Sequence, residues 1–129
     1  MFYVRGVKMR NMKKENGQSL VEFALVLPIL LILVFGIIDF GMLFSAKNQL
    51  EMTSFAAART ISLGNTVPTP PPGITVIPMF LPTGYTVGQQ VTVTASSTYT
   101  GITPIFNVFF GSNDVELTSN IKVVIEQLP

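Results

Sequence analysis

The sequence predicts an α+β membrane protein: a long N-terminal helix, transmembrane in its first half and extended outside in its second, followed by a small antiparallel β domain with a short helix. An apolar run over residues 23–44 holds a single charged residue. Helix-forming residues without glycine or proline continue over residues 45–63. After a proline-rich stretch, the apolar residues alternate with the period of two that is typical of strands. This change of period separates a helical region from a β region.

The first element is a basic leader, residues 1–17, which we expect on the cytoplasmic side. Residues 1–16 carry five bases against one acid, a net charge of +4, whereas residues 17–129 carry three bases and six acids, a net charge of −3. Lys and Arg clustered beside a membrane span resist translocation, so the N-terminus should lie inside and the remainder outside. The alternative is a nucleic-acid-binding arm. Five bases that directly flank an apolar run favour membrane topology, and we expect no nucleic-acid partner.

The second element is one helix over residues 18–63, whose first half crosses the bilayer once. At 1.5 Å per residue, roughly 20 residues cross a hydrocarbon core of about 30 Å, so the apolar run is long enough. With Leu30 and Leu31 at the midplane, Glu22 and Asp39 each fall about 13 Å from it, where a carboxylate reaches water. A cleaved signal peptide would have a shorter apolar core. A lipoprotein signal would need a cysteine, and the chain has none.

Two features of this helix leave alternatives open. Pro28 removes a backbone hydrogen bond, which is tolerated in a membrane when neighbouring groups satisfy the freed carbonyl. It predicts either a functional kink or a tolerated proline. The outer half carries mostly small residues along one side. They permit close approach of another helix or of the chain's own globular part. Alternatively, they reflect helix propensity alone. These residues are Ala46, Leu50, Thr53, Ser54 and Ala57.

A proline-rich stretch over residues 64–73 marks the predicted boundary between the helix and an external β-rich domain, residues 74–129. Prolines favour an extended, semi-rigid linker because they deny hydrogen-bond donors to helix and sheet. Alternation over residues 91–100 and over residues 117–126 predicts two strands, each with one wetter face. A weaker third strand precedes them and contains Pro78, which predicts an edge position.

The segment between the two better strands predicts a short helix. Thr103 is a suitable N-cap, Pro104 fits the first helical position, and Gly111 fits the end. We expect its bulky apolar side chains to close the core of the small sheet, with contact to the membrane surface or to another subunit as the alternatives. These side chains are Ile105, Phe106, Val108, Phe109 and Phe110.

The composition excludes several kinds of chemistry. The chain has no histidine and no cysteine, which excludes thiol catalysis, histidine general-base catalysis, disulfides and thiolate or imidazole metal sites. Asp114 and Glu116 form an acidic pair in a polar turn, and a solvated turn explains them better than a weak calcium site does. No phosphate-binding loop or nucleophile elbow is present. We therefore expect no enzyme activity, no cofactor and no metal.

The candidate functional site is the stretch GQSLVEF at residues 17–23, which places a glycine and a carboxylate at the cytoplasmic edge of the span. Residues 16–59, which include GQSLVEFALVLPILLILVFGIIDFG and AAAR, resemble the TadE-like family of minor pilins or pseudopilins of tight-adherence (Flp, type IVc) pilus systems. The resemblance combines several features in order: Gly17, Glu22-Phe23, Leu27-Pro28, Ile38-Asp39-Phe40-Gly41 and Arg59.

This resemblance implies cleavage by a prepilin peptidase between Gly17 and Gln18, which leaves Glu22 as the fifth residue of the mature chain. It also implies that Glu22 and Phe23 form an assembly contact. Major pilins of this type usually carry Glu-Tyr at that place and end soon after the helix. Phe23 and the added β domain therefore indicate the minor class, which supports pilus assembly, secretion or surface adhesion.

The resemblance further implies a bacterial cytoplasmic (inner) membrane location and, after assembly, a place in an extracellular pilus. The implied partners are the prepilin peptidase, other pilin or pseudopilin subunits, the inner-membrane assembly platform and the lipid bilayer. Physically, Glu22 of one subunit would neutralise the free amine of Gln18 in its neighbour. Alternatively, Glu22 merely marks the membrane interface. The alternative function is an uncleaved, single-pass, membrane-anchored assembly or adhesion factor with a small external domain.

Overall fold

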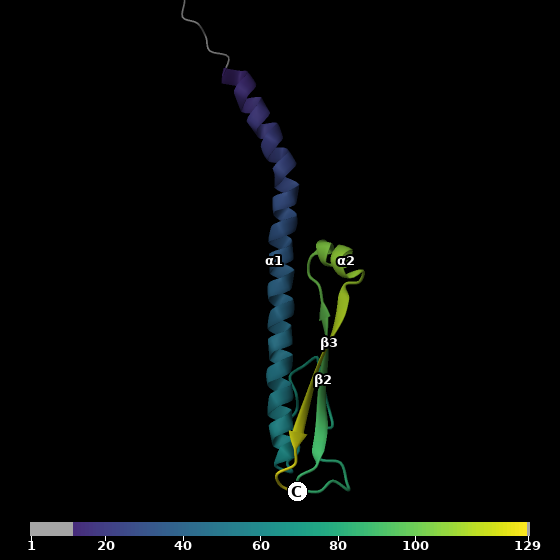
Figure 1. Cartoon of the computed structure of the whole chain (residues 1–129). Coiled ribbons are helices and arrows are strands. Elements are labelled where there is room, and N and C mark those ends of the chain that lie inside the picture. Colours follow the sequence, from purple (N-terminus) through teal and green to yellow (C-terminus); the bar gives the residue numbers. More distant parts are fainter. Residues whose placement is uncertain (1–11, 129) are drawn as a thin grey trace, which may run out of the picture. The chain divides into compact units, whose positions relative to one another are not determined.

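The computed structural model describes residues 12–128, with side chains described from Gly17 onward (Figure 1). Most of the predicted basic leader, residues 1–17, lies outside the described residues, and no side chain before Gly17 is described. The elements follow one another as α1 (Met12–Ser62), β1 (Ile74–Ile77), β2 (Gln90–Thr100), α2 (Pro104–Phe110) and β3 (Asp114–Val124). This order confirms the predicted long helix, small antiparallel sheet and short helix.

The chain divides into two compact units, residues 1–35 and residues 36–129, with the boundary inside α1. In the first unit, every described side chain from Gly17 on is exposed, and Pro28 lies inside the helix without ending it. Among the described residues, α1 is the one helix long and apolar enough to cross a membrane, with a mean hydropathy of 2.9 over its most apolar window. None of that window is buried within the structure.

α1 ends in a glycine turn. Gly64 has a φ of 72°, a left-handed conformation that only glycine adopts without steric cost. Its N–H donates to the Ile61 carbonyl, and the Asn65 N–H donates to the Thr60 carbonyl, both at 3.0 Å. These two bonds form a Schellman motif, which satisfies carbonyls that the end of the helix leaves free. α1 thus ends at Ser62, one residue before the predicted end at residue 63.

The three strands form an antiparallel sheet in the order β1-β2-β3, with β2 in the centre. β1 is an edge strand, as predicted from Pro78, but it ends at Ile77, before this proline. Proline lacks the N–H that would continue the ladder. β3 begins at Asp114, three residues earlier than predicted, because its start pairs with the end of β2: Asp114 lies opposite Thr100.

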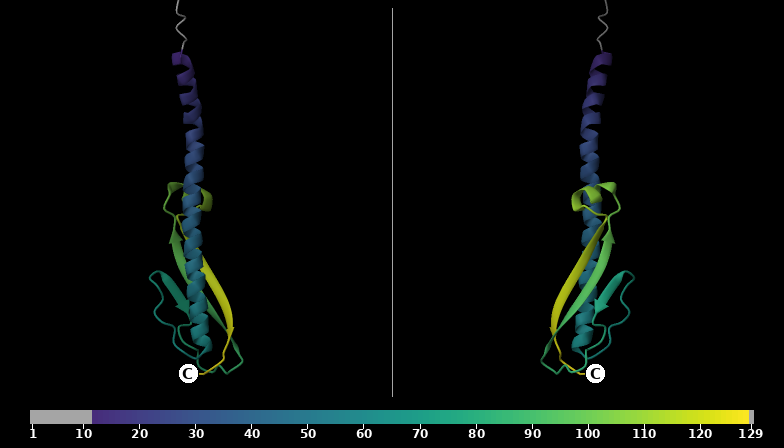
Figure 2. Two further views of the ribbon diagram at one scale, coloured as in Figure 1. Left: turned by 90° about the vertical axis from the view of Figure 1, so that its left-hand side faces the viewer. Right: turned by 90° about the vertical axis from the view of Figure 1, so that its right-hand side faces the viewer.

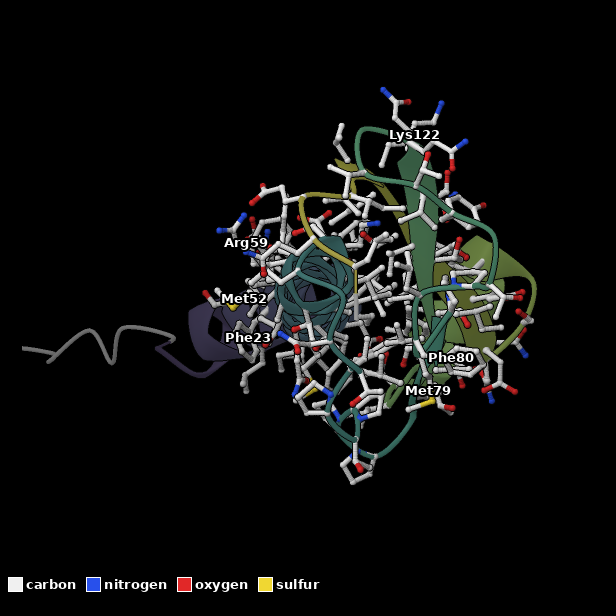
Figure 3. The ribbon with its side chains drawn as sticks, turned by 90° about the horizontal axis from the view of Figure 1, so that it is seen from below. Phe23, Met52, Arg59, Met79, Phe80 and Lys122 are labelled. Atoms are coloured by element: carbon white, nitrogen blue, oxygen red, sulfur yellow. The ribbon has the colours of Figure 1, made fainter. Side chains whose placement is uncertain are left out.

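One face of α1 packs on the sheet within the second unit (Figures 2 and 3). Figure 3 shows Met52 and Arg59 on the side of the helix that faces away from β2. Each Val, Leu or Ile buried in this core contributes roughly 1.5–3 kcal/mol to folding. The small residues of α1 therefore serve the close approach of the chain's own sheet. The buried core consists of Leu50, Ala57, Ala58, Ile61, Val76, Val91, Val93, Ala95 and Ile125.

Polar contacts run along the same face of the helix. The Ser54 and Ser119 hydroxyls lie 2.8 Å apart, and the Lys47 ammonium donates to the Thr118 carbonyl at 3.0 Å. The carbonyl of Ser62 accepts the N–H of Glu126 at 2.7 Å. α1 thus follows β3 from its middle to just beyond its end, which positions the sheet along the outer part of the helix.

The proline-rich stretch lies against this unit and belongs to it. Val67 packs against the core, and its N–H donates to the Met79 carbonyl at 2.8 Å. Between this stretch and α1 lies a hollow of about 330 Å³, whose lining includes Met52 and Pro70. The compact unit begins inside α1, because the helix supplies one side of the core.

Candidate functional site

The predicted site residues Gly17, Gln18, Glu22 and Phe23 all lie in α1, and their side chains are exposed. A Cβ atom added at Gly17 would meet nothing within 4 Å. Gln18 and Glu22 are four residues apart, so they share one face of the helix. The four residues form an open helical surface, which suits recognition by another protein better than chemistry within a cavity.

A second cluster, which the sequence did not predict, centres on Asp39. Its side chain is only 3% exposed, whereas we had expected it to reach water. One carboxylate oxygen accepts the backbone N–H groups of Ile102 and Thr103, each at 3.3 Å, and the other accepts the Thr103 hydroxyl. These three donors take the place of the water molecules that the carboxylate loses when it is buried. We call Asp39, Ile102 and Thr103 the Asp39 latch.

The latch uses the residue that begins α2. Thr103 is the N-cap, as predicted, but its side chain makes no capping hydrogen bond because it donates to Asp39 instead. Pro104 takes an early helical position where no N–H is required. Gly111 ends the helix with a φ of 73°, and its N–H donates to the Asn107 carbonyl at 2.8 Å. The short helix is confirmed, and the role of its N-cap side chain differs from the prediction.

Aromatic rings extend the latch into a cluster that joins α1, β2 and α2. Phe106, which is 2% exposed, contacts the Tyr99 ring edge-on at 5.6 Å and stacks on Phe110 at 4.4 Å between centroids. Phe110 in turn contacts Phe40 of α1 at 6.1 Å. Aromatic pairs of this geometry add roughly 0.5–1.5 kcal/mol each beyond their buried area. The cluster therefore holds α2 against the helix near Asp39.

Tyr99 carries the one buried polar side-chain atom without a hydrogen-bond partner among the described residues, its hydroxyl oxygen. Burial raises the pKa of Tyr99 above its ordinary value of 10.0, and the negative charge of Asp39 raises this pKa further. Both causes disfavour the phenolate, so the hydroxyl stays protonated at neutral pH. Tyr99 serves here as a ring that packs on Phe106.

The prediction that the aromatic segment closes the core is right for Phe106 and wrong for Val108 and Phe109. Val108 is 81% exposed and Phe109 is 71% exposed. A helix of two turns presents only one face to its neighbours, and residues four apart share that face. Phe106 and Phe110 point toward the cluster, which leaves the other face of α2 apolar and uncovered within the described chain.

Gly101 makes room for the Phe106 ring, so Gly101→Ala is expected to destabilise the second unit by about 1–3 kcal/mol, as overpacking does. An added Cβ would lie 2.6 Å from the Phe106 Cβ and closer still to the ring. Hydrogen exchange of the α2 amides in the full chain measures this effect. The control Gly41→Ala meets nothing within 4 Å and should leave exchange unchanged or slower, because alanine favours a helix. Equal exchange in the two variants would contradict the packing role of Gly101.

Several charged side chains of the second unit form surface contacts. Lys47 and Glu51 pair at 3.6 Å, and Arg59 pairs with Glu126 at 2.9 Å. Such exposed pairs contribute little to stability. Asp114 accepts the Thr100 hydroxyl at 2.7 Å. Over residues 17–128, no three acidic side chains gather in a way that would hold a metal ion.

The structure thus defines a class: a small α+β protein whose N-terminal helix is a candidate membrane anchor. Residues 17–59 match the family described as TadE-like protein, which confirms the resemblance that the sequence predicted. The match begins at Gly17, includes Glu22 and Asp39, and ends at Arg59, within α1. It supports a general association with tight-adherence pilus systems. Searches of curated proteins and of solved structures returned no match to the chain.

Proposed function

We propose that the protein is a minor pilin or pseudopilin of a tight-adherence (Flp, type IVc) pilus, cut by a prepilin peptidase after Gly17. The TadE-like match over residues 17–59 carries this proposal. In it, the basic leader keeps the N-terminus in the cytoplasm, α1 crosses the inner membrane, and the β unit lies outside. The protein supports assembly, secretion or adhesion through other pilin subunits and the assembly platform, and it has no enzymatic activity of its own.

The exposed apolar surface of α1 supports this proposal physically. All described side chains of residues 17–35 are exposed, and most are large and apolar. Such a surface requires a non-aqueous partner on every side. Lipid supplies it before assembly, and neighbouring helices supply it within a filament, where close packing replaces lipid contacts. A helix uniformly apolar around its axis suits both environments.

Cleavage is expected to require a small residue, Gly17, immediately before the cut. Gly17→Val should leave Met1 as the N-terminus in the presence of prepilin peptidase, whereas the natural chain should begin at Gln18. A Cβ atom added at Gly17 meets nothing within 4 Å in the described structure, so we expect a loss of cleavage to report recognition by the peptidase instead of misfolding. N-terminal sequencing of the membrane fraction, with and without the peptidase, measures this.

Gly36→Val is the matched control, because it places the same side chain at another open position of α1. It should be cut like the natural chain. An intact Met1 in the natural chain with active peptidase present would overturn the proposed processing. That result would favour the uncleaved membrane-anchored factor, whose outer unit already has its own core.

A further inference from the structure

A group of large apolar side chains in the second unit remains exposed within the described chain, although Phe40 and Phe110 also contact each other. It combines exposed residues of α1 with exposed residues on and beside α2, and we call it the apolar tip. No charged residue occurs over residues 101–111. The apolar tip consists of Phe40, Phe44, Ile102, Val108, Phe109 and Phe110.

The position of the apolar tip along α1 identifies what covers it. At 1.5 Å per residue, the uncharged stretch of residues 23–38 spans only about 24 Å, less than the roughly 30 Å of a hydrocarbon core. A complete span must continue past Asp39 to about residue 42. Phe110 contacts Phe40, and the Thr103 N–H donates to Asp39. α2 is therefore fastened to α1 at the outer end of the span, where the hydrocarbon meets the headgroups.

The Asp39 latch makes this depth tolerable for a carboxylate. An ionised carboxylate at a membrane boundary needs water or donors, and burial without them is costly. The two backbone N–H groups and the Thr103 hydroxyl supply donors from within the chain. Asp39 can lie at the edge of the hydrocarbon because α2 accompanies it there.

An apolar hollow continues the same surface toward β3. It has a volume of about 220 Å³ and is lined by Phe40, Leu43, Phe44, Lys47 and Leu117. Lys47 is the first cation after the apolar run. An apolar hollow beside a cationic group matches the two ends of a phospholipid, an acyl chain and an anionic headgroup.

We propose that the apolar tip inserts into the outer leaflet of the bilayer, at the boundary between headgroups and acyl chains, and so docks the β unit on the membrane. Interfacial helices bury an apolar face about 5–10 Å deep in this way. The inference rests on the membrane span of the proposed function, but it does not depend on cleavage after Gly17 or on pilus assembly.

Tryptophan reporters test the insertion, because the natural chain has no tryptophan. The full chain carrying Phe109→Trp is reconstituted into vesicles of phosphatidylcholine and phosphatidylglycerol whose acyl chains are brominated near the headgroup. We expect emission at shorter wavelength than in water, loss of most of this emission to the bromine, and protection from iodide in solution.

Phe80→Trp is the matched control, because Phe80 is 62% exposed and follows β1. β1 runs from Ile74, opposite Ser97, to Ile77, opposite Thr94, and so leads away from the end of β2 that precedes α2. Phe80→Trp should be quenched by iodide and not by brominated lipid. Leu31→Trp is the reference for the span and should be quenched by lipid brominated near the chain ends. These three reporters separate the tip, the outer sheet and the span.

Two outcomes for Phe109→Trp overturn the inference while Leu31→Trp reports a normal span. Quenching by iodide alone means that the tip faces water. Protection from both quenchers means that protein, such as a second copy of the chain, covers it. If Leu31→Trp itself escapes lipid quenching, the span fails, and both the proposed membrane anchoring and the insertion of the tip are overturned.

Discussion

Asp39→Ala is expected to accelerate hydrogen exchange of the α2 amides by about 30-fold, which corresponds to a loss of about 2 kcal/mol. The substitution removes the acceptor of two backbone N–H groups and one hydroxyl at once. Thr103 is buried, so its donors cannot regain water without opening the structure. Leaving a buried donor unsatisfied costs about 1–3 kcal/mol. Exchange is measured by mass spectrometry on the full chain in detergent micelles.

Graded variants identify the latch as the cause. Asp39→Asn keeps one oxygen for the two backbone N–H groups and should have a smaller effect. Thr103→Val removes only the hydroxyl and should cost about 1 kcal/mol. Asp114→Ala is the matched control, because its exposed carboxylate accepts a single side-chain hydrogen bond. Equal exchange of α2 in the Asp39→Ala and Asp114→Ala variants would contradict the latch.

The latch also connects the stability of α2 with the insertion of the apolar tip. The N-cap Thr103 contacts α1 through the Asp39 carboxylate, and Phe110 of α2 contacts it through the Phe40 ring. Removing the carboxylate breaks the first of these two contacts. The reporter Phe109→Trp in the Asp39→Ala background should therefore become more accessible to iodide than in the natural background.

The features that were predictable from the sequence rest on local signals. The end of α1 was readable because Gly64 and Asn65 supply a left-handed turn within a few residues of the last helical hydrogen bonds. The strands were readable because a period of two is a property of consecutive residues. Thr103 and Gly111 likewise mark the two ends of α2 and are its direct neighbours in the sequence.

The features that were not predictable depend on distant residues. Asp39 and Thr103 are 64 positions apart in the sequence. A carboxylate near the end of a membrane span is stabilised equally well by water or by any set of hydrogen-bond donors. Composition showed that the aromatic segment is apolar, but the division into an inward Phe106 and an outward Phe109 arises only when Tyr99 packs against one face of α2.

The proposed cut site was recognised in another way. Gly17 and Glu22 were recognised by their order and their position beside the apolar run, and the structure places both on an exposed stretch of α1. The function proposed for them involves molecules outside the chain. A physical argument for Glu22 must therefore begin with the N-terminus that cleavage would create.

Glu22→Ala is expected to abolish pili while membrane insertion and cleavage after Gly17 continue. Cleavage would leave a free amine on Gln18, and this amine enters an apolar array of helices as a subunit joins the filament. A buried, unpaired charge costs several kcal/mol. Glu22 is exposed on α1 and is able to pair with the amine of a neighbouring subunit, which favours a staggered arrangement. Electron microscopy and the sheared surface fraction measure piliation.

The charge of Glu22, and not its shape, should decide this result. Glu22→Gln keeps the size of the side chain but leaves the amine without a counter-charge, so it should fail like Glu22→Ala. Glu22→Asp keeps the charge on a shorter side chain and should restore part of the piliation. Glu51→Ala removes a carboxylate from the outer half of the same helix, where Glu51 pairs with Lys47, and should leave pili intact. Normal pili from both Glu22→Ala and Glu22→Gln would mean that Glu22 only marks the membrane interface.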